Sequence, residues 1–286
     1  MTAPTNPQSG AHTVAGEDPA LRRRPQQPVP DYVAPHGLLA DKVVVVTAAA
    51  GAGIGAAVTR RVLEEGARAV VLSDTHERRV AEAHETLAAE FGADRVASTL
   101  CDVTDEAQVQ ALLDAAEPFG GLDVMINNAG LGGTAPITEM TDEQWTRVLD
   151  ITLTGTFRCV RAASNRMITA GTRGTIVNNA SVIGWRAQEG QAHYAAAKAG
   201  VMALTRCAAL DVAEHGIRVN AVSPSLAMHP FLAKVTSDEL LDVLTQREAF
   251  GRAAEPWEIA NVMVFLASDY ASYLTGEVIS ASSQRA

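Results

Sequence analysis

The sequence predicts an α/β protein with one doubly wound, mostly parallel sheet of seven strands and helices on both faces. Short apolar runs, typical of buried parallel strands, alternate along the chain with longer segments of helical periodicity. The 286 residues are 47% hydrophobic, which is enough for one sizeable core. We therefore expect a single domain around one sheet, without a second, separate domain.

The elements of this fold can be assigned in chain order. The first strand, 43–47, is followed by a glycine-rich turn and a helix that begins at Ile54. The remaining strands are expected at 69–73, 95–100, 122–127, 175–177, 217–223 and 277–281. Helices are expected near 76–91, 105–117, 142–170, 193–215 and 256–268.

Residues 1–36 differ in composition from the domain expected over 37–286. They are rich in Pro, Gln, Ser, Thr and Gly and contain no apolar run long enough for a signal sequence. We interpret them as a flexible extension, either disordered or embracing a neighbouring subunit. No segment approaches the roughly 20 consecutive apolar residues of a membrane helix.

The charge and the cysteines exclude several classes of function. A net charge of −10 without a long basic stripe argues against nucleic-acid binding, which needs clustered Lys and Arg. Cys101, Cys159 and Cys207 are an odd, scattered set with neither metal nor disulfide spacing. They indicate a reducing cytoplasm and no metal site.

Ser181, Tyr194 and Lys198 form the pattern that carries chemistry. Tyr194 and Lys198 are one turn apart on a predicted helix, and Ser181 follows the strand before it. A phenol has a pKa of about 10 and is a poor base near neutrality unless a cation such as Lys198 stabilises its phenolate. With a dinucleotide moving the hydride, Ser181 can hold a substrate oxygen while Tyr194 exchanges the proton. A Tyr-x-x-x-Lys pair alone is more often a surface pair, so the interpretation depends on the upstream motifs.

Upstream, the strand, glycine turn and helix of 43–63 match the context of a dinucleotide fingerprint. Gly51, Gly53 and Gly55 let the backbone approach a pyrophosphate at the start of the helix. Asp74 ends the second strand about 20 residues later, where an acid accepts from ribose hydroxyls and repels a 2′-phosphate. This favours NAD over NADP, unless Asp74 only caps the next helix or Arg78 and Arg79 offset it.

These motifs, in this order, resemble the single-domain short-chain dehydrogenase/reductase family over residues 38–280, and the resemblance implies a Rossmann-like fold. Three further segments carry it: 101-CDVT-104, 127-NNAG-130 and 220-NAVSPS-225. The resemblance implies that a cofactor contacts Thr47, Ile54, Asp102, Val103, Asn128, Ala129, Gly130, Pro224 and Ser225, together with Tyr194 and Lys198.

The chain departs from the family pattern at four places. Thr47 is followed by three alanines, so the glycine loop is one residue longer than usual. Thr152 stands where the family has a fourth catalytic residue, an Asn that helps hold a relay water, and we expect a rearranged relay with retained activity. The usual Pro-Gly is Pro224-Ser225, and His229 aligns with the Thr that binds the carboxamide, although it can equally be a solvent-exposed histidine. The tail lacks the usual Asp-Gly-Gly.

The expected substrate is a small-molecule secondary alcohol or ketone, bulky and partly apolar. Arg186 can bind a carboxylate or a CoA phosphate, or be salt-bridged within its own loop. The segments 178-NNASVIGWRAQ-188 and 220-NAVSPSLAMH-229 further resemble actinobacterial dehydrogenases of sterol-ring degradation, which oxidise a ring hydroxyl on CoA-linked intermediates. The expected lining residues are Leu131, Trp185, Arg186, Gln188, His193, Leu226, Met228 and Phe231.

Two other functions remain open from the sequence. Reductases of 3-oxoacyl thioesters share the same core motifs. A dinucleotide-binding sensor or scaffold without catalysis is the alternative of another class, although the complete Ser181, Tyr194 and Lys198 set argues against it. The resemblance also implies a homodimer or homotetramer.

Overall fold

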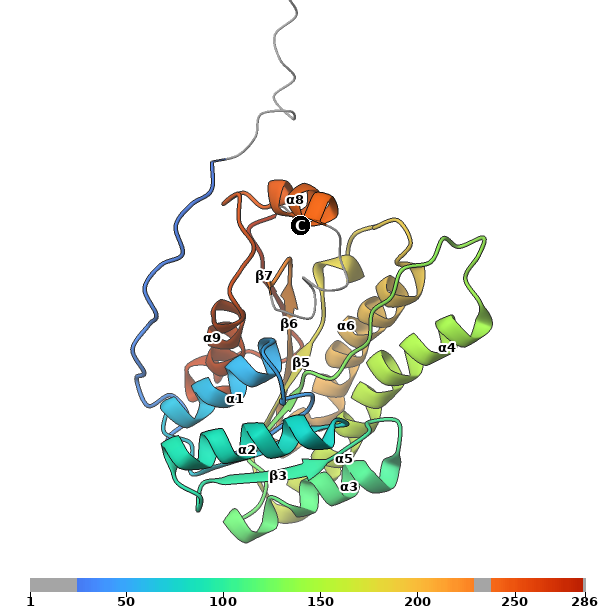
Figure 1. Cartoon of the computed structure of the whole chain (residues 1–286). Coiled ribbons are helices and arrows are strands. Elements are labelled where there is room, and N and C mark those ends of the chain that lie inside the picture. Colours follow the sequence, from blue (N-terminus) through green and yellow to red (C-terminus); the bar gives the residue numbers. More distant parts are fainter. Residues whose placement is uncertain (1–24, 229–237, 285–286) are drawn as a thin grey trace, which may run out of the picture.

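The computed structural model describes residues 25–228 and 238–284, which form one seven-stranded sheet flanked by helices (Figure 1). The strand order is β3-β2-β1-β4-β5-β6-β7, and every pairing is parallel. The order reverses between β1 and β4, so the loops after these two strands diverge and leave a crevice for ligands. The strands are β1 (Val43–Val46), β2 (Ala69–Asp74), β3 (Val96–Leu100), β4 (Val124–Asn127), β5 (Thr175–Asn179), β6 (Arg218–Pro224) and β7 (Val278–Ala281).

Helices cover both faces of the sheet, as the uninterrupted apolar strands require. In β1, Val44 and Val46 pack into one apolar cluster and Val43 and Val45 into another on the opposite face. The first cluster includes α1 (Ile54–Glu64), α2 (Glu77–Phe91) and α9 (Pro256–Ala267). The second includes α3 (Glu106–Asp114), α5 (Gly155–Ala170) and α6 (Ala192–Val212). Both α/β fold class and single-sheet topology are therefore confirmed.

Two helical regions differ from the sequence prediction. The helix expected over 142–170 is α4 (Asp142–Leu149), a π-helical turn at Asp150–Thr154, and then α5. A further helix, α8 (Asp238–Arg247), lies in a stretch where no helix was expected. No helix in the described part of the chain combines the length and apolar character needed to cross a bilayer.

The described part of the N-terminal extension, residues 25–36, follows the outside of α1 and α9 without forming a helix or strand (Figure 1). Tyr32 packs edge-on against Trp257 of α9, with ring centroids 5.2 Å apart. The guanidinium of Arg61 on α1 lies over the Tyr32 ring and donates to the carbonyls of Val33 and Ala34. Residues 25–36 therefore contact the domain at defined points, while residues 1–24 lie outside the described ranges and their flexibility stays a prediction.

Candidate active site

Ser181 and Tyr194 meet at the carboxyl edge of the sheet. Ser181 follows β5, and its extended backbone makes it the N-cap of a 3-10 turn, where its hydroxyl accepts from the Ile183 N–H at 3.3 Å. Tyr194 is in the first turn of α6, and its phenol hydrogen-bonds the Ser181 hydroxyl. The fold thus joins two groups that are 13 residues apart in the sequence.

Lys198 lies one helical turn after Tyr194 and is almost fully buried. Its Nζ is 5.6 Å from the centroid of the Tyr194 ring and donates to the carbonyl of Asn179 at 2.5 Å. Burial lowers the pKa of Lys198 to about 8. Burial also raises the pKa of Tyr194, and the hydrogen bond with Ser181 opposes that rise. Burial is the larger of these two effects, so the pKa of the phenol is raised and the phenol keeps its proton near neutral pH.

Thr152 occupies the π-helical turn between α4 and α5 and is fully buried. Its Oγ1 accepts from the Leu131 N–H at 2.9 Å and donates to the Leu131 carbonyl at 3.1 Å. The hydroxyl has one proton, which this contact uses, so only a remaining lone pair is left for a relay water. Thr152 therefore holds the backbone after Gly130, which borders Lys198: a Cβ on Gly130 would be 3.4 Å from the lysine Nζ.

The longer glycine loop has an unusual backbone. Ala48 has a φ of +50°, in the left-handed region that favours glycine, and Gly51 has a φ of +152°. Gly55 lies so close to the loop that a Cβ there would be 2.1 Å from the Ala48 carbonyl oxygen. The loop leads to Gly53, the N-cap of α1, which has no side-chain capping bond and no acidic residue in the first turn. The N–H groups at the start of α1, beginning with Ile54, are thus available to an anion.

Thr47 joins the glycine loop to the segment after β4. Its Oγ1 accepts from the N–H groups of Asn128 and Ala129, both at 3.0 Å. The Asn128 amide donates to the Ala48 carbonyl at 3.0 Å, and its oxygen accepts from the Asn179 amide at 2.9 Å. These bonds connect the ends of β1, β4 and β5 into one rigid base beside the crevice.

The acidic residues at the ends of β2 and β3 lie as the sequence predicted. Asp74 is the last residue of β2, and Arg79 Nη2 is 3.5 Å from its carboxylate. Asp102 follows β3 and accepts from the N–H and hydroxyl of Thr104 at 2.9 and 2.8 Å. Val103 is buried and packs against Gly155, because a Cβ on Gly155 would be 2.5 Å from the Val103 Cγ2.

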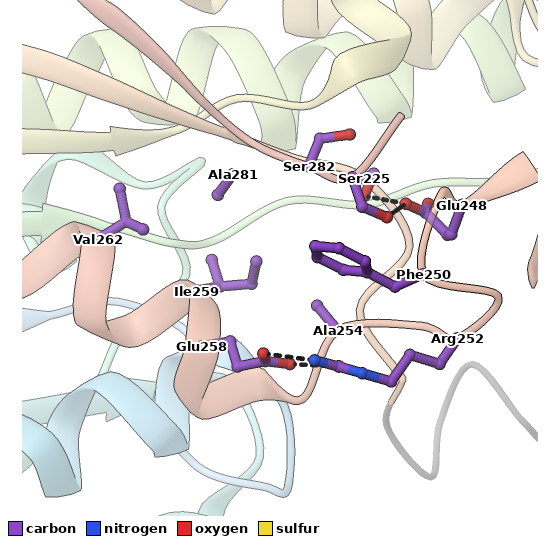
Figure 2. A pocket seen from close by; sticks show the side chains of 11 residues that line it. Ser225, Glu248, Phe250, Arg252, Ala254, Glu258, Ile259, Val262, Ala281 and Ser282 are labelled. Atoms are coloured by element: carbon purple, nitrogen blue, oxygen red, sulfur yellow. Dashed lines mark hydrogen bonds and ion pairs between the residues drawn. The ribbon is translucent and has the colours of Figure 1, made fainter. Parts of the chain in front are cut away.

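The segment after β6 is held by Glu248, a buried carboxylate. Pro224 ends β6, and Glu248 accepts from the Ser225 hydroxyl at 3.1 Å and the Leu226 N–H at 3.2 Å. A cavity of about 190 Å³ lies beside this carboxylate. Figure 2 shows Glu248 and Ser225 at one side of it, with Phe250 and Ile259 along it. The cavity lies between the ends of β6 and β7 and α9, beside the segment expected to cover the cofactor.

The loop between β5 and α6 frames the predicted substrate region. His193 is buried, its Nδ1 accepts from the Tyr194 N–H at 2.9 Å, and its Nε2 would be 3.2 Å from a Cβ on Gly133. Gln191 donates to the Gly133 carbonyl at 2.7 Å. Arg186 donates to the Gln284 side chain at 2.5 Å. The loop therefore reaches the segment after β4 on one side and the C-terminal tail on the other.

The other predicted pocket residues are placed unevenly. Trp185 is exposed and Gln188 is half-buried in the same loop. Leu226 and Met228 pair with Ala254 through backbone bonds of 2.8 and 3.0 Å. His229 and Phe231 lie outside the described residues. No group of three His, Cys, Asp or Glu side chains suited to a metal occurs within the described ranges.

Comparison with known proteins decides the family. A family profile described as Enoyl-(Acyl carrier protein) reductase matches residues 48–283. A crystal structure of a short chain dehydrogenase from Mycobacterium smegmatis has a TM-score of 0.80 and 54% identity, covering 91% of this chain and 99% of that one. The chain belongs to the short-chain dehydrogenase/reductase family. It is accordingly an oxidoreductase, and its cofactor is NAD(P).

Among the relatives of this short-chain dehydrogenase/reductase, two have names that specify a ring substrate with a carboxyl-derived group. The (5R,7aS)-5-hydroxy-7a-methyl-1-oxo-2,3,5,6,7,7a-hexahydro-1H-indene-carboxyl-CoA reductase of Mycobacterium tuberculosis is 62% identical over 256 residues, covering 89% of this chain and 97% of the relative. The cis-4-hydroxycyclohexanecarboxylate dehydrogenase of Sinomonas cyclohexanicum is 43% identical over 253 residues, covering 84% and 94%.

The crevice of this short-chain dehydrogenase/reductase fits a dinucleotide. The uncapped start of α1 suits a pyrophosphate, because free N–H groups and the helix dipole both favour negative charge there. The small residues of the loop leave the backbone accessible, and Asp74 ends the neighbouring strand. Such a cofactor supplies or accepts a hydride when bound.

Several residues at this enzyme's site were not predicted from the sequence. Asn179 accepts from Lys198, Gln191 ties two loops together, and Glu248 and Gln284 join the segment after β6 to the tail. Each acts through a partner distant in the sequence. The only sequence signal for the last two was the unusual tail and the serine in place of a glycine at Ser225.

Proposed function

We propose that this enzyme interconverts a ring alcohol and a ring ketone on a bulky alicyclic substrate that carries a carboxyl-derived group. The observation that carries the chemistry is the hydrogen bond between Ser181 and Tyr194 with the Lys198 ammonium beside the phenol ring. A phenol next to a second hydroxyl is suited to hold one oxygen atom and exchange one proton with it.

Each group has a separate role in the proposal. The Ser181 hydroxyl holds the substrate oxygen and fixes its distance from the phenol. Tyr194 gives its proton to that oxygen in reduction and takes it back in oxidation. Lys198 stabilises the phenolate that remains after proton donation, because its charge lies beside the ring in a poorly solvated place. Thr152 acts on the segment that borders Lys198 rather than on the substrate.

NAD is the proposed cofactor, in preference to NADP. Asp74 at the end of β2 is placed to accept from ribose hydroxyls and to repel a 2′-phosphate. Arg79 lies 3.5 Å from this carboxylate and weakens the repulsion, whereas Arg78 pairs with Glu82 at 2.9 Å and points its charge elsewhere. We expect Asp74→Ala to reduce the preference for NAD by roughly 10-fold or more, measured as the ratio of kcat/KM for the two cofactors.

Two relatives support the proposed substrate class. Both named relatives act on a ring that carries a hydroxyl and a carboxyl-derived group, one as the free acid and the other as the CoA derivative. The substrate ring is proposed to contact apolar side chains, because transfer of an apolar ring from water to an apolar surface costs little free energy. These side chains are Leu131, Trp185, Leu226 and Met228.

The experiment that tests the function is initial-rate turnover with NAD and NADP separately. The panel contains bicyclic and steroidal ring alcohols, cis-4-hydroxycyclohexanecarboxylate, its CoA thioester and 3-hydroxyacyl-CoA thioesters. Oxidation of ring alcohols with NAD supports the proposal. Preference for 3-hydroxyacyl thioesters with NADP would replace it by an acyl-thioester reductase, and cofactor binding without any turnover would indicate a sensor or scaffold.

Tyr194→Phe is the matched control for that panel. It removes one oxygen and leaves the ring in place, so cofactor affinity should stay within about twofold while turnover falls at least 100-fold. Near wild-type turnover in this variant would remove Tyr194 from the proton transfer.

We also propose a cytoplasmic homo-oligomer. Large apolar side chains are exposed on α4 and α5 and again near α9, where water contact is unfavourable and a second copy would cover them. The three cysteines are free within the described ranges, as expected in a reducing compartment. Light scattering of the purified chain measures the assembly. The exposed side chains are Trp145, Phe157, Ile168, Phe265, Tyr270 and Tyr273.

A further inference from the structure

Arg186 reaches from the loop after Ser181 to the C-terminal tail. Its Nη1 donates to the Gln284 Oε1 at 2.5 Å, and the Gln284 Nε2 donates to Glu248 at 2.6 Å. Gln284 therefore stands between a guanidinium, which can only donate, and a carboxylate, which can only accept. A side-chain amide is suited to this position because it offers one oxygen and one NH2 group, and the two neighbours fix its orientation.

The sheet topology places this cation above β6. Arg186 belongs to the loop after β5, Gln284 follows β7, and β6 lies between these strands. The loop, the tail or both must therefore reach over the carboxyl end of β6 to make the contact. Neighbouring strands are about 4.8 Å apart, so Arg186 is roughly one strand from Ser181 and three strands, about 14 Å, from the end of β1 where the phosphates of a cofactor are expected. The position favours the substrate over the cofactor phosphates.

The guanidinium is held without being neutralised by a direct ion pair. None of the ion pairs found among residues 25–228 and 238–284 involves Arg186. Its Nη2 is buried and has no acceptor among the described residues, and a buried donor without a partner costs stability. The ion pair within its own loop that the sequence left open is absent there.

Resting on the proposed function, we propose that Arg186 determines specificity by binding the carboxyl-derived oxygen of the substrate, and that Gln284 positions it for this contact. The shared chemistry is an oxygen acceptor at the end of the ring remote from the reacting hydroxyl. A free carboxylate offers two oxygens to the planar fork of the guanidinium, and a thioester carbonyl offers one.

The network also explains the departures from the family tail. Glu248 accepts from Ser283 at 2.7 Å as well as from Gln284, and it holds Ser225 and Leu226 from the other side. In a tail that lacks the family's usual Asp-Gly-Gly, Ser283 and Gln284 thus supply the hydroxyl and the amide that the buried carboxylate requires. The tail becomes part of the substrate site through these two side chains.

The test compares wild type with Arg186→Ala and Gln284→Leu, with Arg78→Ala as the matched loss of an exposed arginine on α2. Turnover is measured on cis-4-hydroxycyclohexanecarboxylate, on its CoA thioester and on the neutral 4-methylcyclohexanol. Binding of cyclohexanecarboxylate to the NAD-loaded protein is measured by calorimetry. Arg186→Ala should lower kcat/KM for the carboxylate and the affinity for cyclohexanecarboxylate by about 10- to 100-fold, with a change below about twofold for the neutral alcohol.

Further outcomes separate the parts of the proposal. Gln284→Leu should raise the KM for the carboxylate with little change in kcat, and millimolar guanidinium ion should partly restore Arg186→Ala but not Gln284→Leu. A large effect on the free acid alone identifies a carboxylate site, and equal effects on acid and thioester identify a carbonyl contact.

The failures of the two proposals can also be told apart. Equal losses on carboxylate and neutral alcohol, or no loss of carboxylate binding, would overturn the role of Arg186 while leaving the ring-alcohol activity standing. Arg186-dependent binding of cyclohexanecarboxylate without turnover of any ring alcohol would instead overturn the proposed function.

Discussion

Thr152→Val exchanges a hydroxyl for a methyl group at a fully buried position with almost no change in shape. It removes both hydrogen bonds to the backbone of Leu131, at 2.9 and 3.1 Å. At about 1 kcal/mol net for each bond, the free energy of unfolding should fall by about 2 kcal/mol, and by up to about 4 kcal/mol if water cannot reach the freed N–H and carbonyl groups. For a chain of this size a loss of about 2 kcal/mol corresponds to a Tm lower by roughly 4 to 8 °C.

The same substitution should reduce turnover through the position of the Gly130–Leu131 segment, which borders Lys198. Misplacement of about 1 Å near reacting groups costs roughly 100-fold in rate, so we expect kcat/KM to fall about 10- to 100-fold while cofactor affinity changes little. Calorimetry or urea denaturation gives the stability, and initial rates with titrated NAD give the kinetic constants.

Three variants make this test discriminating. Thr152→Ser keeps the hydroxyl and should keep most of the activity, while Thr152→Asn supplies both a donor and an acceptor and should stay similar or higher in activity. Thr156→Val removes only the bond from the Thr156 hydroxyl to the Thr152 carbonyl at 2.8 Å, and should cost less than about 1 kcal/mol. Unchanged stability of Thr152→Val together with lost turnover would refute the clamp and assign the hydroxyl to a proton relay.

Three more outcomes are expected. Alcohol oxidation should speed up with rising pH and ketone reduction should slow down, because burial raises the pKa of Tyr194 and the phenol must lose its proton to act as a base. Lys198→Met should shift the pH dependence of the oxidation rate to higher pH. Rates independent of pH would contradict this role of Tyr194. Gly55→Ala should abolish NAD binding, as measured by calorimetry, since the new Cβ would be 2.1 Å from the Ala48 carbonyl oxygen in the preceding loop. Retained affinity would mean that the loop relaxes to make room for the Cβ. Arg61→Ala should cost about 3 kcal/mol in urea unfolding, because it leaves buried Glu65 without its cation at 2.6 Å; a loss below about 1 kcal/mol would show that the backbone donors suffice.

The placement of the proposed site residues on their strands and helices was predictable because it depends on short-range periodicity. Tyr194 and Lys198 share a face on any helix that contains both, and Ser181 and Asp74 follow strands that their apolar runs reveal. The periodic spacing of apolar residues is visible in the sequence because each strand or helix buries one face, on which the apolar residues repeat. The boundaries found in the structure differ from those expected by only a few residues.

The details that tune the site were not predictable, since they depend on partners far away in the chain. The π-helical turn at Thr152 interrupts a periodicity that otherwise reads as one helix. Ala48 adopts a backbone conformation that its identity disfavours, and Thr47 and the segment after β4 lie against that loop. The rise in the pKa of Tyr194 likewise follows from burial, which no single element determines.

The amino-acid sequence by itself determined the α/β class, the order of the elements and the positions of the proposed proton-transfer groups within them, because hydrophobic periodicity and residue chemistry are local properties. Only the tertiary structure decided that Thr152 holds the Leu131 backbone and that Arg186 meets Gln284 across the end of β6. Those contacts join positions up to 98 residues apart. They exist because parallel strands bring their carboxyl ends to one edge, where loops distant in sequence must satisfy one another's polar groups.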